Sequence, residues 1–383
     1  MQIAKLQRKT LLDLFLYFFR LSWTAFGGPL AYIAMMEDDC VEKKKWLSKE
    51  EFTEMLGITN MLPGPNATEM AIHIGHARGG KLAGIISGLA FTIPSFVIMV
   101  ALSWLYFQYG SMPTVSGLFY GINPVVVAII VVTLVRLGRV SLSDWKLTCI
   151  FIITVLLSYF TALNEALILL LSGFAGILLY GKISKRHSLP VLALLPFGLG
   201  LVQNAESLPI LLQLFLEFLK GGVLMFGTGL VIIPLLAPDV VNVFGWMSYK
   251  EFFDGVTLGQ ITPGPVMKTA AFVGYKVAGV SGAAAAMSGI FLPPFVIVTL
   301  LAPFLRKMRT NAWLQGFLKG VKAGTVGVIL AVVPSLAKVA FPDLPAIAIF
   351  AIAALVILRF RVNTSLLVIS CGMLGVALRF LSP

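Results

Sequence analysis

The stretch that decides the fold occurs twice in the chain, as Leu62-Pro63-Gly64-Pro65-Asn66 and as Thr262-Pro263-Gly264-Pro265-Val266. Each copy lies inside a long apolar segment. Proline lacks a backbone donor and clashes with the preceding helical turn, and glycine adopts conformations that other residues avoid. Each Pro-Gly-Pro therefore predicts a break in a helix at membrane depth, where irregular backbone is tolerated only inside protein or along a wet cavity.

The composition indicates a membrane protein. Of the 383 residues, 58% are hydrophobic and 12% are charged, which is about half the charged share of soluble proteins. No Asp, Glu, Lys or Arg occurs in the 54 residues between Lys81 and Arg136, or in the 29 residues between Lys276 and Arg306. About 20 apolar residues cross a bilayer. The pattern excludes a soluble enzyme, a disordered chain and a nucleic-acid-binding domain, so we expect a multi-pass membrane protein with lipid as its surroundings.

The chain is an internal duplication. The matched residues, at an offset of 200 and then of 199, are Phe26-Gly27 with Phe226-Gly227, Trp46 with Trp246, Glu51-Phe52 with Glu251-Phe252, Pro94 with Pro293 and Gly121 with Gly320. We therefore predict a first transporter repeat at 1–181, a linker with an extra transmembrane span at 182–207, and a second repeat at 208–383.

The basic residues orient the two repeats. The net charge of +12 comes from scattered clusters between apolar segments, as expected for cytoplasmic loops. With the N-terminus inside, the basic clusters all become cytoplasmic if the second repeat is inverted relative to the first, and inverted repeats are typical of secondary transporters. We predict an all-α polytopic fold with two inverted-topology repeats.

About 13 transmembrane segments are expected, two of them broken at Pro-Gly-Pro. Their ranges are 11–36, 48–78, 81–108, 114–135, 147–161, 163–181, 189–202, 209–236, 248–278, 280–303, 313–335, 344–358 and 363–381. If 48–78 and 248–278 are re-entrant hairpins instead, fewer segments cross, and the basic N-terminus favours crossing.

The helices that restart after each break are candidate anion sites. We expect Pro65 and Pro265 at the first helical position. The backbone N–H groups of Asn66, Ala67 and Thr68, and of Val266, Met267 and Lys268, then point into a site. A helix start carries roughly half a positive charge and binds anions.

Polar side chains inside the apolar segments extend this candidate substrate site. Asn66, Glu69, His73 and His76 lie on one helical stripe, which predicts an anion or proton pathway, with a structural hydrogen-bond pair as the alternative. Lys268 is predicted to pair with a bound dianion or, alternatively, with Glu69. The set is completed by Gly27, Gly28, Gly64, Gly227, Gly229, Gln260, Thr262 and Gly264. Close packing of helices is the alternative for the glycines at 27, 28, 227 and 229, and a mere kink of the helix is the alternative for those of the two Pro-Gly-Pro stretches. We assign no catalytic residue, metal ligand or cofactor.

These motifs resemble the chromate ion transporters in their two-domain form. In the first half the resemblance rests on Phe26-Gly27-Gly28-Pro29, Trp46-Leu47 and the run from Gly57 to Gly75. In the second half it rests on Phe226-Gly227-Thr228-Gly229 and the run from Gly259 to Val266. It implies a plasma-membrane carrier that expels chromate, handles or competes with sulfate, and is driven by protons or by anion exchange. The chain differs from the family at His76, where an aromatic residue is expected, and at Lys268, where a small hydroxyl residue is expected.

We therefore predict a secondary transporter, not an enzyme, that exports chromate while one repeat rocks against the other. A sulfate or molybdate carrier and a passive anion channel are alternatives in the same class. An intramembrane metal-dependent enzyme built on Glu69 and His73 is the alternative from another class. A homodimer is among the oligomeric states considered.

Overall fold

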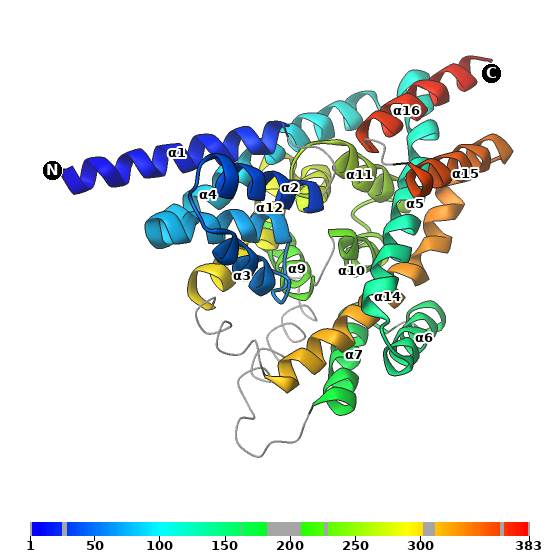
Figure 1. Ribbon diagram of the computed structural model, residues 1–383. Helices are drawn as coiled ribbons and strands as arrows, with labels where there is room; N and C mark the ends of the chain where they lie inside the picture. Colours follow the sequence, from blue (N-terminus) through cyan, green and yellow to red (C-terminus); the bar gives the residue numbers. More distant parts are fainter. Residues whose placement is uncertain are drawn as a thin grey trace. The chain divides into compact units, whose positions relative to one another are not determined.

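The computed structural model describes residues 2–24, 29–161, 163–181, 208–225, 229–301, 311–360 and 364–381. All regular elements within these ranges are helices (Figure 1), which confirms the all-α prediction. Among them, four are long and apolar enough to cross a membrane: Asn66–Tyr109, Pro113–Ser141, Thr269–Leu300 and Ala312–Ala340. They contain most of the spans predicted to begin at 81, 114, 280 and 313. The predicted linker span at 189–202 lies outside the described residues.

The chain folds as two compact units, and each unit takes residues from both halves of the sequence. Unit 1 comprises Met1–Val100, Ser188–Gly229 and Thr262–Asn311, and unit 2 comprises Ala101–His187, Leu230–Ile261 and Ala312–Pro383. The compact units therefore do not coincide with the two sequence repeats. Both Pro-Gly-Pro stretches belong to unit 1.

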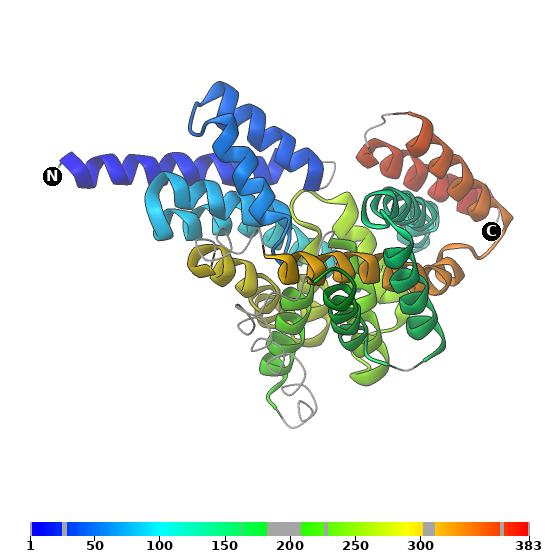
Figure 2. The ribbon, with the colours of Figure 1, turned by 60° about the horizontal axis from the view of Figure 1, so that its bottom comes forward.

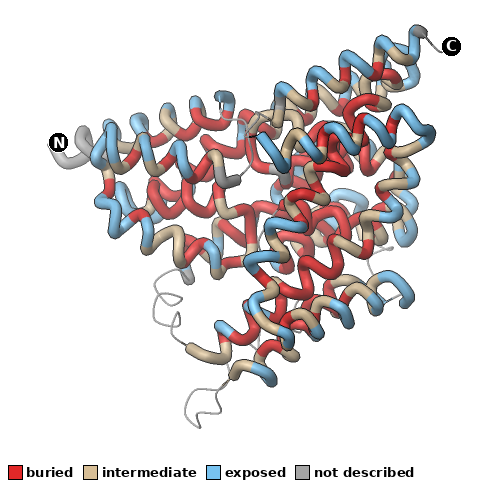
Figure 3. The backbone as a smooth tube through the Cα atoms, turned by 45° about the vertical axis from the view of Figure 1, so that its right-hand side comes forward, coloured by how far each residue is buried: buried red, intermediate tan, exposed pale blue. Residues whose placement is uncertain are grey.

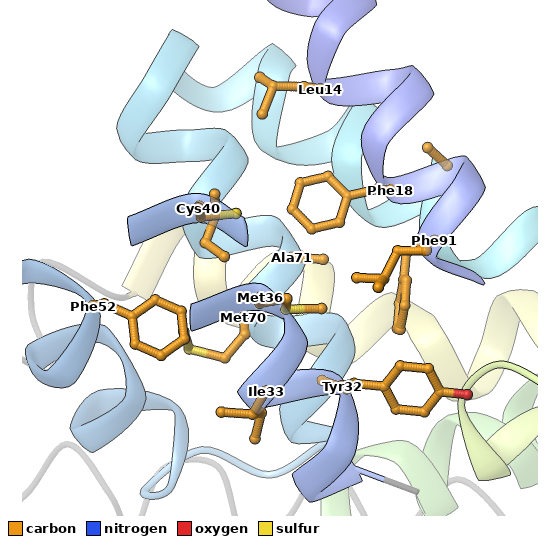
Figure 4. Packing of buried hydrophobic residues seen from close by; sticks show 14 of the residues in the cluster. Leu14, Phe18, Tyr32, Ile33, Met36, Cys40, Phe52, Met70, Ala71 and Phe91 are labelled. Atoms are coloured by element: carbon orange, nitrogen blue, oxygen red, sulfur yellow. The ribbon is translucent and has the colours of Figure 1, made fainter. Parts of the chain in front are cut away.

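Unit 1 is built on a core of apolar side chains from its first four helices. The elements of this unit are α1 (Gln2–Thr24), α2 (Pro29–Glu37), the π-helix η1 (Asp38–Lys43), α3 (Lys49–Thr59), most of α4 (Asn66–Tyr109), α9 (Ile210–Leu224), the 3-10 turn η6 (Val266–Lys268), α12 (Thr269–Val296) and η7 (Ile297–Leu301). Figure 4 shows Phe18 of α1 and Met36 of α2 packed toward Met70 and Phe91 of α4. Helix α9 packs along α12.

The predicted span 11–36 is not one helix. Tyr17 in α1 donates a hydrogen bond from its hydroxyl to Asp39 Oδ2 in η1 at 3.3 Å. On a straight helix these two residues would lie about 33 Å apart, so α2 runs back along α1. The predicted span 209–236 is interrupted in the same place, because α9 ends at Leu224 and is followed by η4 (Gly229–Val231), α10 (Ile232–Pro238) and the π-helix η5 (Asp239–Val243).

The segment 48–78 is a helical hairpin rather than a membrane crossing. Ser48 and Glu51 form a capping box that starts α3. At the other end of the segment, the Arg78 guanidinium lies 5.6 Å from the centroid of the Trp46 ring. The start and end of the segment are therefore adjacent, because the Pro-Gly-Pro reverses the chain between them. The prediction that 48–78 crosses the membrane is wrong, and the re-entrant alternative describes it.

Helices α4 and α12 each consist of two arms that meet at a glycine. In α4 the backbone leaves helical geometry at Gly79 and Gly80, where Gly80 has φ 76°, and in α12 it does so at Ala278 and Gly279, where Gly279 has φ 60°. These positions are equivalent in the two repeats. The arms of α4 pack on each other, since a Cβ on Gly75 would lie 2.3 Å from Ser87 Oγ. We call residues 66–78 and 81–109 the first and second arms of α4.

Unit 2 repeats one helix-packing arrangement twice. Its helices are the end of α4, α5 (Pro113–Ser141), α6 (Trp145–Phe160), α7 (Glu165–Tyr180), α10, η5, α11 (Tyr249–Ile261), α14 (Ala312–Ala340), α15 (Leu344–Arg359) and α16 (Thr364–Leu381). Helix α5 packs against α15 and α16, and its equivalent α14 packs against α6 and α7. In Figure 3 helices carry buried residues on one side and exposed residues on the other. Figure 2 shows α15 and α16 as a pair of helices in orange and red.

Small residues bring the equivalent helices of unit 2 into close contact. A Cβ on Gly121 of α5 would lie 1.9 Å from the backbone oxygen of Cys371 in α16. A Cβ on Gly320 of α14 would lie 2.0 Å from the backbone oxygen of Ser172 in α7. The offset of 199 maps one contact onto the other. The duplication therefore extends to individual backbone contacts, of the small-residue kind that packs membrane helices.

Replacing either glycine by alanine tests this packing. Alanine normally favours a helix over glycine by about 1 kcal/mol, but here its methyl group overlaps a backbone oxygen. We expect Gly121→Ala and Gly320→Ala each to destabilise the purified protein by about 1–3 kcal/mol, seen as a lower melting temperature. Gly138→Ala in α5 is the matched control, because its Cβ would meet only ordinary contacts, the nearest at 3.8 Å. Equal melting temperatures for all three variants would contradict the packing.

The hairpin at 48–78 predicts that its two ends are labelled from one side of the membrane. Lys49 and Ala77 are both exposed. In a cysteine-free background, we expect Lys49→Cys and Ala77→Cys to react with a membrane-impermeant maleimide from the same side. Thr114→Cys and Arg139→Cys, near the two ends of α5, serve as controls that react from opposite sides. Labelling of positions 49 and 77 from opposite sides would show a crossing segment instead.

Candidate functional site

Both Pro-Gly-Pro stretches break their helices and are held by contacts with other segments of unit 1. We call residues 60–65 break 1 and residues 262–265 break 2. Gly64 has φ 144° and Gly264 has φ 100°, values that side-chain-bearing residues rarely adopt. The N–H of Gly64 donates to the Met225 carbonyl at 2.8 Å.

The hydroxyl of Tyr32 holds break 2. It accepts a hydrogen bond from the Gly264 N–H at 2.5 Å and donates to the Gly264 carbonyl at 3.3 Å. The Tyr32 ring packs edge-on against Phe91, with ring centroids 5.4 Å apart. Figure 4 shows the ring within the apolar core and its hydroxyl pointing out of it. The core of unit 1 thereby fixes the position of break 2.

Each break packs against the long helix of the other repeat. A Cβ on Gly64 would lie 3.2 Å from Pro294 Cβ in α12, and a Cβ on Gly264 would lie 2.3 Å from Ser95 Cβ in α4. Pro294 and Ser95 are equivalent at the offset of 199. The two breaks are therefore built in the same way, and Gly264 in particular leaves no room for a side chain.

The helix starts differ from the prediction in one respect. The Pro65 carbonyl accepts the N–H of Thr68 at 2.8 Å and that of Glu69 at 3.1 Å, and the Pro265 carbonyl accepts the N–H of Lys268 at 3.3 Å. Both prolines thus precede the first helical residue. The N–H groups of Thr68 and Lys268 bond within their own turns, so the prediction that they point into a site is wrong. Asn66 and Ala67 occupy the first two positions of α4, whose N–H groups have no partner inside a helix.

Glu69 is a fully buried carboxyl group at break 1. It is 0% exposed, and neither carboxyl oxygen has a hydrogen-bond partner among the described residues. Its carboxyl group covers Gly64, where a Cβ would lie 2.6 Å from Glu69 Oε1. Burying an isolated carboxylate costs far more free energy than burying the neutral acid. The site therefore favours a protonated Glu69 in the absence of a positively charged partner.

Further polar atoms continue along the first arm of α4. His73 is 7% exposed, and its Nε2 has no hydrogen-bond partner within the described part of the chain; the same holds for Thr68 Oγ1. Asn66 donates from Nδ2 to Asn60 Oδ1 across break 1 at 2.8 Å. Buried polar atoms normally find a partner. A row of unpartnered ones at membrane depth is typical of a path that water or a ligand enters.

Lys268 is fully buried and bonds only to backbone oxygens in the contacts the structure gives. Its Nζ donates to the carbonyls of Thr262 at 2.8 Å, Pro263 at 2.8 Å and Gly264 at 3.2 Å. An ammonium group has three N–H donors, and the carbonyl oxygens of this loop accept a hydrogen bond from each of them. Lys268 therefore forms no ion pair with Glu69 in the contacts that the structure gives, and its pairing with a bound dianion stays a prediction.

The remaining predicted site residues are distributed as follows. Gly27, Gly28, Gly227 and the side chain of Val266 lie outside the described residues. Gly229 lies in η4 and Met267 in η6, and both are buried. Gln260 lies in α11 within unit 2. Unit 1 holds the rest: Gly64, Pro65, Asn66, Ala67, Thr68, Glu69, His73, Thr262, Gly264, Pro265 and Lys268.

Several residues that contact the breaks, and one buried ion pair, were not predicted from the sequence. Tyr32, Ser95 and Met225 contact the breaks, and nothing in their local sequence indicates it, since those contacts join segments far apart in the chain. In α9, Lys220 and Glu217 form a buried ion pair at 2.7 Å, with side chains 6% and 1% exposed. An acid and a base three residues apart in an apolar helix was a usable signal for this pair.

A buried carboxylate also organises unit 2. Asp254 in α11 is 0% exposed and accepts hydrogen bonds from Asn123 at 2.9 Å, Tyr106 at 2.7 Å and Lys250 at 2.9 Å. Thr257 donates to the Asn123 side-chain oxygen at 2.9 Å. Unlike Glu69, this carboxylate is well supplied with donors, as a structural network requires.

Comparison with known proteins identifies the family. The sequence profile of the chromate transporter family matches residues 12–177 and 212–376. The chain is 32% identical to a chromate transport protein of Cupriavidus metallidurans, over 96% of this chain and 92% of that protein. It is 33% identical to a chromate transport protein of Pseudomonas aeruginosa, over 95% and 91%, and 34% identical to a probable chromate transport protein of Synechococcus elongatus, over 88% and 87%.

No solved structure gives a significant match. The family profile matches one segment in each half of the chain. The family is one of transporters and not of enzymes, and with the four helices of membrane-crossing length it makes the protein a multi-pass membrane transporter. The chain belongs to the chromate transporter family.

Proposed function

We propose that the chain exports chromate across the cytoplasmic membrane and that the two breaks of unit 1 form its binding site. The relatives described as chromate transport proteins support the substrate. The observation that carries the site is the pair of Pro-Gly-Pro breaks in one compact unit, each closed around a glycine by the other repeat's long helix. Tetrahedral oxyanions such as sulfate are the related substrates.

Break 1 offers hydrogen-bond donors suited to an oxyanion. The N–H groups of Asn66 and Ala67 begin α4, where the helix dipole favours negative charge. The Thr68 hydroxyl lies beside them, buried and without a partner among the described residues. Lys268 donates hydrogen bonds to the carbonyls of break 2. Its positive charge would attract the oxyanion from that position, without direct contact. His73 extends the polar path away from the break.

Glu69 is the group that we propose to bind the coupling proton. A dianion close to Glu69 favours its neutral form, because like charges repel. Oxyanion binding and proton binding therefore assist each other, and the oxyanion crosses with Glu69 protonated. One proton with one dianion moves a single negative charge outward. The inside-negative membrane potential favours that movement by about 2.3 kcal/mol per 100 mV.

The contacts of unit 2 support an inverted arrangement of the repeats. Tyr120 bonds to Asp343 at 2.7 Å and Arg136 to the Ile357 carbonyl at 3.3 Å, so α5 and α15 run in the same direction. Helices that cross a membrane in succession alternate in direction, so α14 runs opposite to α15. Helices α5 and α14 are equivalent in sequence and would then be antiparallel. Because each compact unit contains parts of both repeats, alternating access would divide the chain by unit rather than by repeat.

Transport by inside-out membrane vesicles tests the substrate and the site together. We expect vesicles that contain the chain to accumulate chromate, and Gly64→Ala to lower the initial rate at least tenfold, because its methyl group displaces the Glu69 carboxyl. Gly245→Ala is the matched control, since Gly245 also has a positive φ, 59°, but open space around its Cβ position. Equal rates for the two variants would contradict the site.

Competition in the same vesicles separates the related functions. Sulfate or molybdate that is accumulated in preference to chromate would identify a carrier for those anions. Chromate current that does not respond to an imposed pH gradient would identify a passive channel. Uptake that requires a counter-anion in the lumen would identify anion exchange.

Replacing Glu69 by glutamine tests the proposed proton coupling. In buffer alkaline enough to ionise Glu69 in the unbound protein, where chromate is a dianion, we expect chromate to bind the purified wild-type protein more tightly as pH falls, by up to about tenfold per pH unit for one proton taken up on binding. Glu69→Gln mimics the neutral acid, so its affinity should be high and independent of pH. Glu42→Gln, at an exposed carboxyl in η1, should behave as wild type. An affinity that falls with falling pH, or a Glu69→Gln profile like that of wild type, would exclude Glu69 as the coupling residue.

A further inference from the structure

The loop of break 2 directs three successive backbone oxygens at one point. These are the carbonyl oxygens of Thr262, Pro263 and Gly264, which we call the carbonyl cage. The positive φ of Gly264, 100°, allows this turn. Pro263 and Pro265 have no backbone N–H to offer the neighbouring carbonyls. The three oxygens therefore concentrate partial negative charge at one point, and the two prolines of the loop cannot donate hydrogen bonds to them.

Converging carbonyls of this kind bind cations. Selectivity filters replace the water shell of a monovalent ion with rings of backbone carbonyls. The cage oxygens lie 2.8–3.2 Å from the Lys268 nitrogen. These distances exceed the roughly 2.0–2.1 Å of Mg²⁺ and the roughly 2.3–2.6 Å of Ca²⁺. They fall in the range of N–H···O hydrogen bonds, about 2.7–3.2 Å, so the cage fits a cation of the size of ammonium.

The Lys268 ammonium is bound as such an ion would be. A buried lysine normally pairs with a carboxylate, but the donors of Lys268 go to the three cage oxygens although its side chain is 0% exposed. Its charge is balanced by peptide dipoles alone in these contacts. The cage itself is anchored from the other side by the Tyr32 hydroxyl, which contacts the N–H and carbonyl of Gly264.

We propose that the carbonyl cage is a binding site for a monovalent cation of the size of ammonium or potassium, and that the Lys268 ammonium is its tethered occupant in this chain. The proposal does not depend on which anion is transported. It assigns Lys268 as a positioning residue, whose terminal amine fills the cage and shapes break 2. Without the amine, the cage is open to a cation from solution.

Removing the amine and supplying free cations tests this assignment. We would purify full-length Lys268→Ala in detergent and measure its melting temperature in choline, potassium and ammonium chloride at equal ionic strength. Choline is too large for the cage. We expect a lowered melting temperature in choline that rises saturably with potassium or ammonium. A cation at ten times its dissociation constant increases the folded-to-unfolded ratio about elevenfold.

Two controls make the response specific. Wild type should show equal melting temperatures in the three salts, because its cage is occupied. Lys276→Ala removes an exposed lysine from the first arm of α12, which follows η6, and should likewise show no dependence on the cation. Lys268→Ser, with a smaller loss of polar contact, is measured in parallel in case the alanine variant does not fold in choline.

A response of the Lys268 variants no larger than that of wild type would overturn the proposal, and so would failure to recover either variant folded in any of the salts. Chromate uptake by the same variants separates this result from the proposed function. Cation-dependent stability without chromate transport by wild type would retain the cage and remove the proposed substrate. Chromate transport without cation-dependent stability would retain the proposed substrate and remove the cage.

Discussion

Backbone N–H and C=O groups that cannot reach water must find partners within the protein, and this constraint determines how the two Pro-Gly-Pro stretches are built. At break 1 the Gly64 N–H donates to the carbonyl of Met225, the residue that follows α9. At break 2 the Tyr32 hydroxyl and the Lys268 ammonium satisfy Gly264 and its neighbours. Each interruption of a helix is thus compensated by a group from elsewhere in unit 1 or from the following turn. The same interruptions place helix starts, a buried carboxyl group and a buried ammonium group in one unit.

The repeats explain why the packing contacts of the two breaks come in pairs. Gly64 meets Pro294 and Gly264 meets Ser95, at equivalent positions of the two halves. In unit 2 the contacts of Gly121 and Gly320 are equivalent in the same way. The two breaks differ in the ionisable side chain that each one carries. Break 1 carries Glu69 without a partner among the described residues, and break 2 carries Lys268 with all three donors bound. The proposed function uses that difference, since Glu69 at break 1 can gain a proton while the bound donors of Lys268 hold break 2 in place.

The sequence was sufficient for the helical class, the duplication and the positions of the breaks, because hydropathy, proline and glycine act locally. It was not sufficient for the path of the chain. The span 11–36 reads as one apolar run, yet Tyr17 and Asp39 are in contact because the chain reverses between α1 and α2. For the site, burial of Glu69 and Lys268 followed from their apolar surroundings, but their partners did not. The carbonyl oxygens around Lys268 converge through the backbone conformation of the loop at Gly264, and Tyr32 reaches break 2 from 232 residues away.

The location of bound chromate tests the central claim, that the breaks of unit 1 form the oxyanion site. Anomalous X-ray diffraction at the chromium absorption edge, from crystals of the chromate-bound protein, locates the metal atom of the substrate directly. The account predicts one strong peak beside the start of α4, within hydrogen-bonding reach of the Asn66 and Ala67 N–H groups through the chromate oxygens. A peak that lies away from both breaks, with none beside α4, would contradict it.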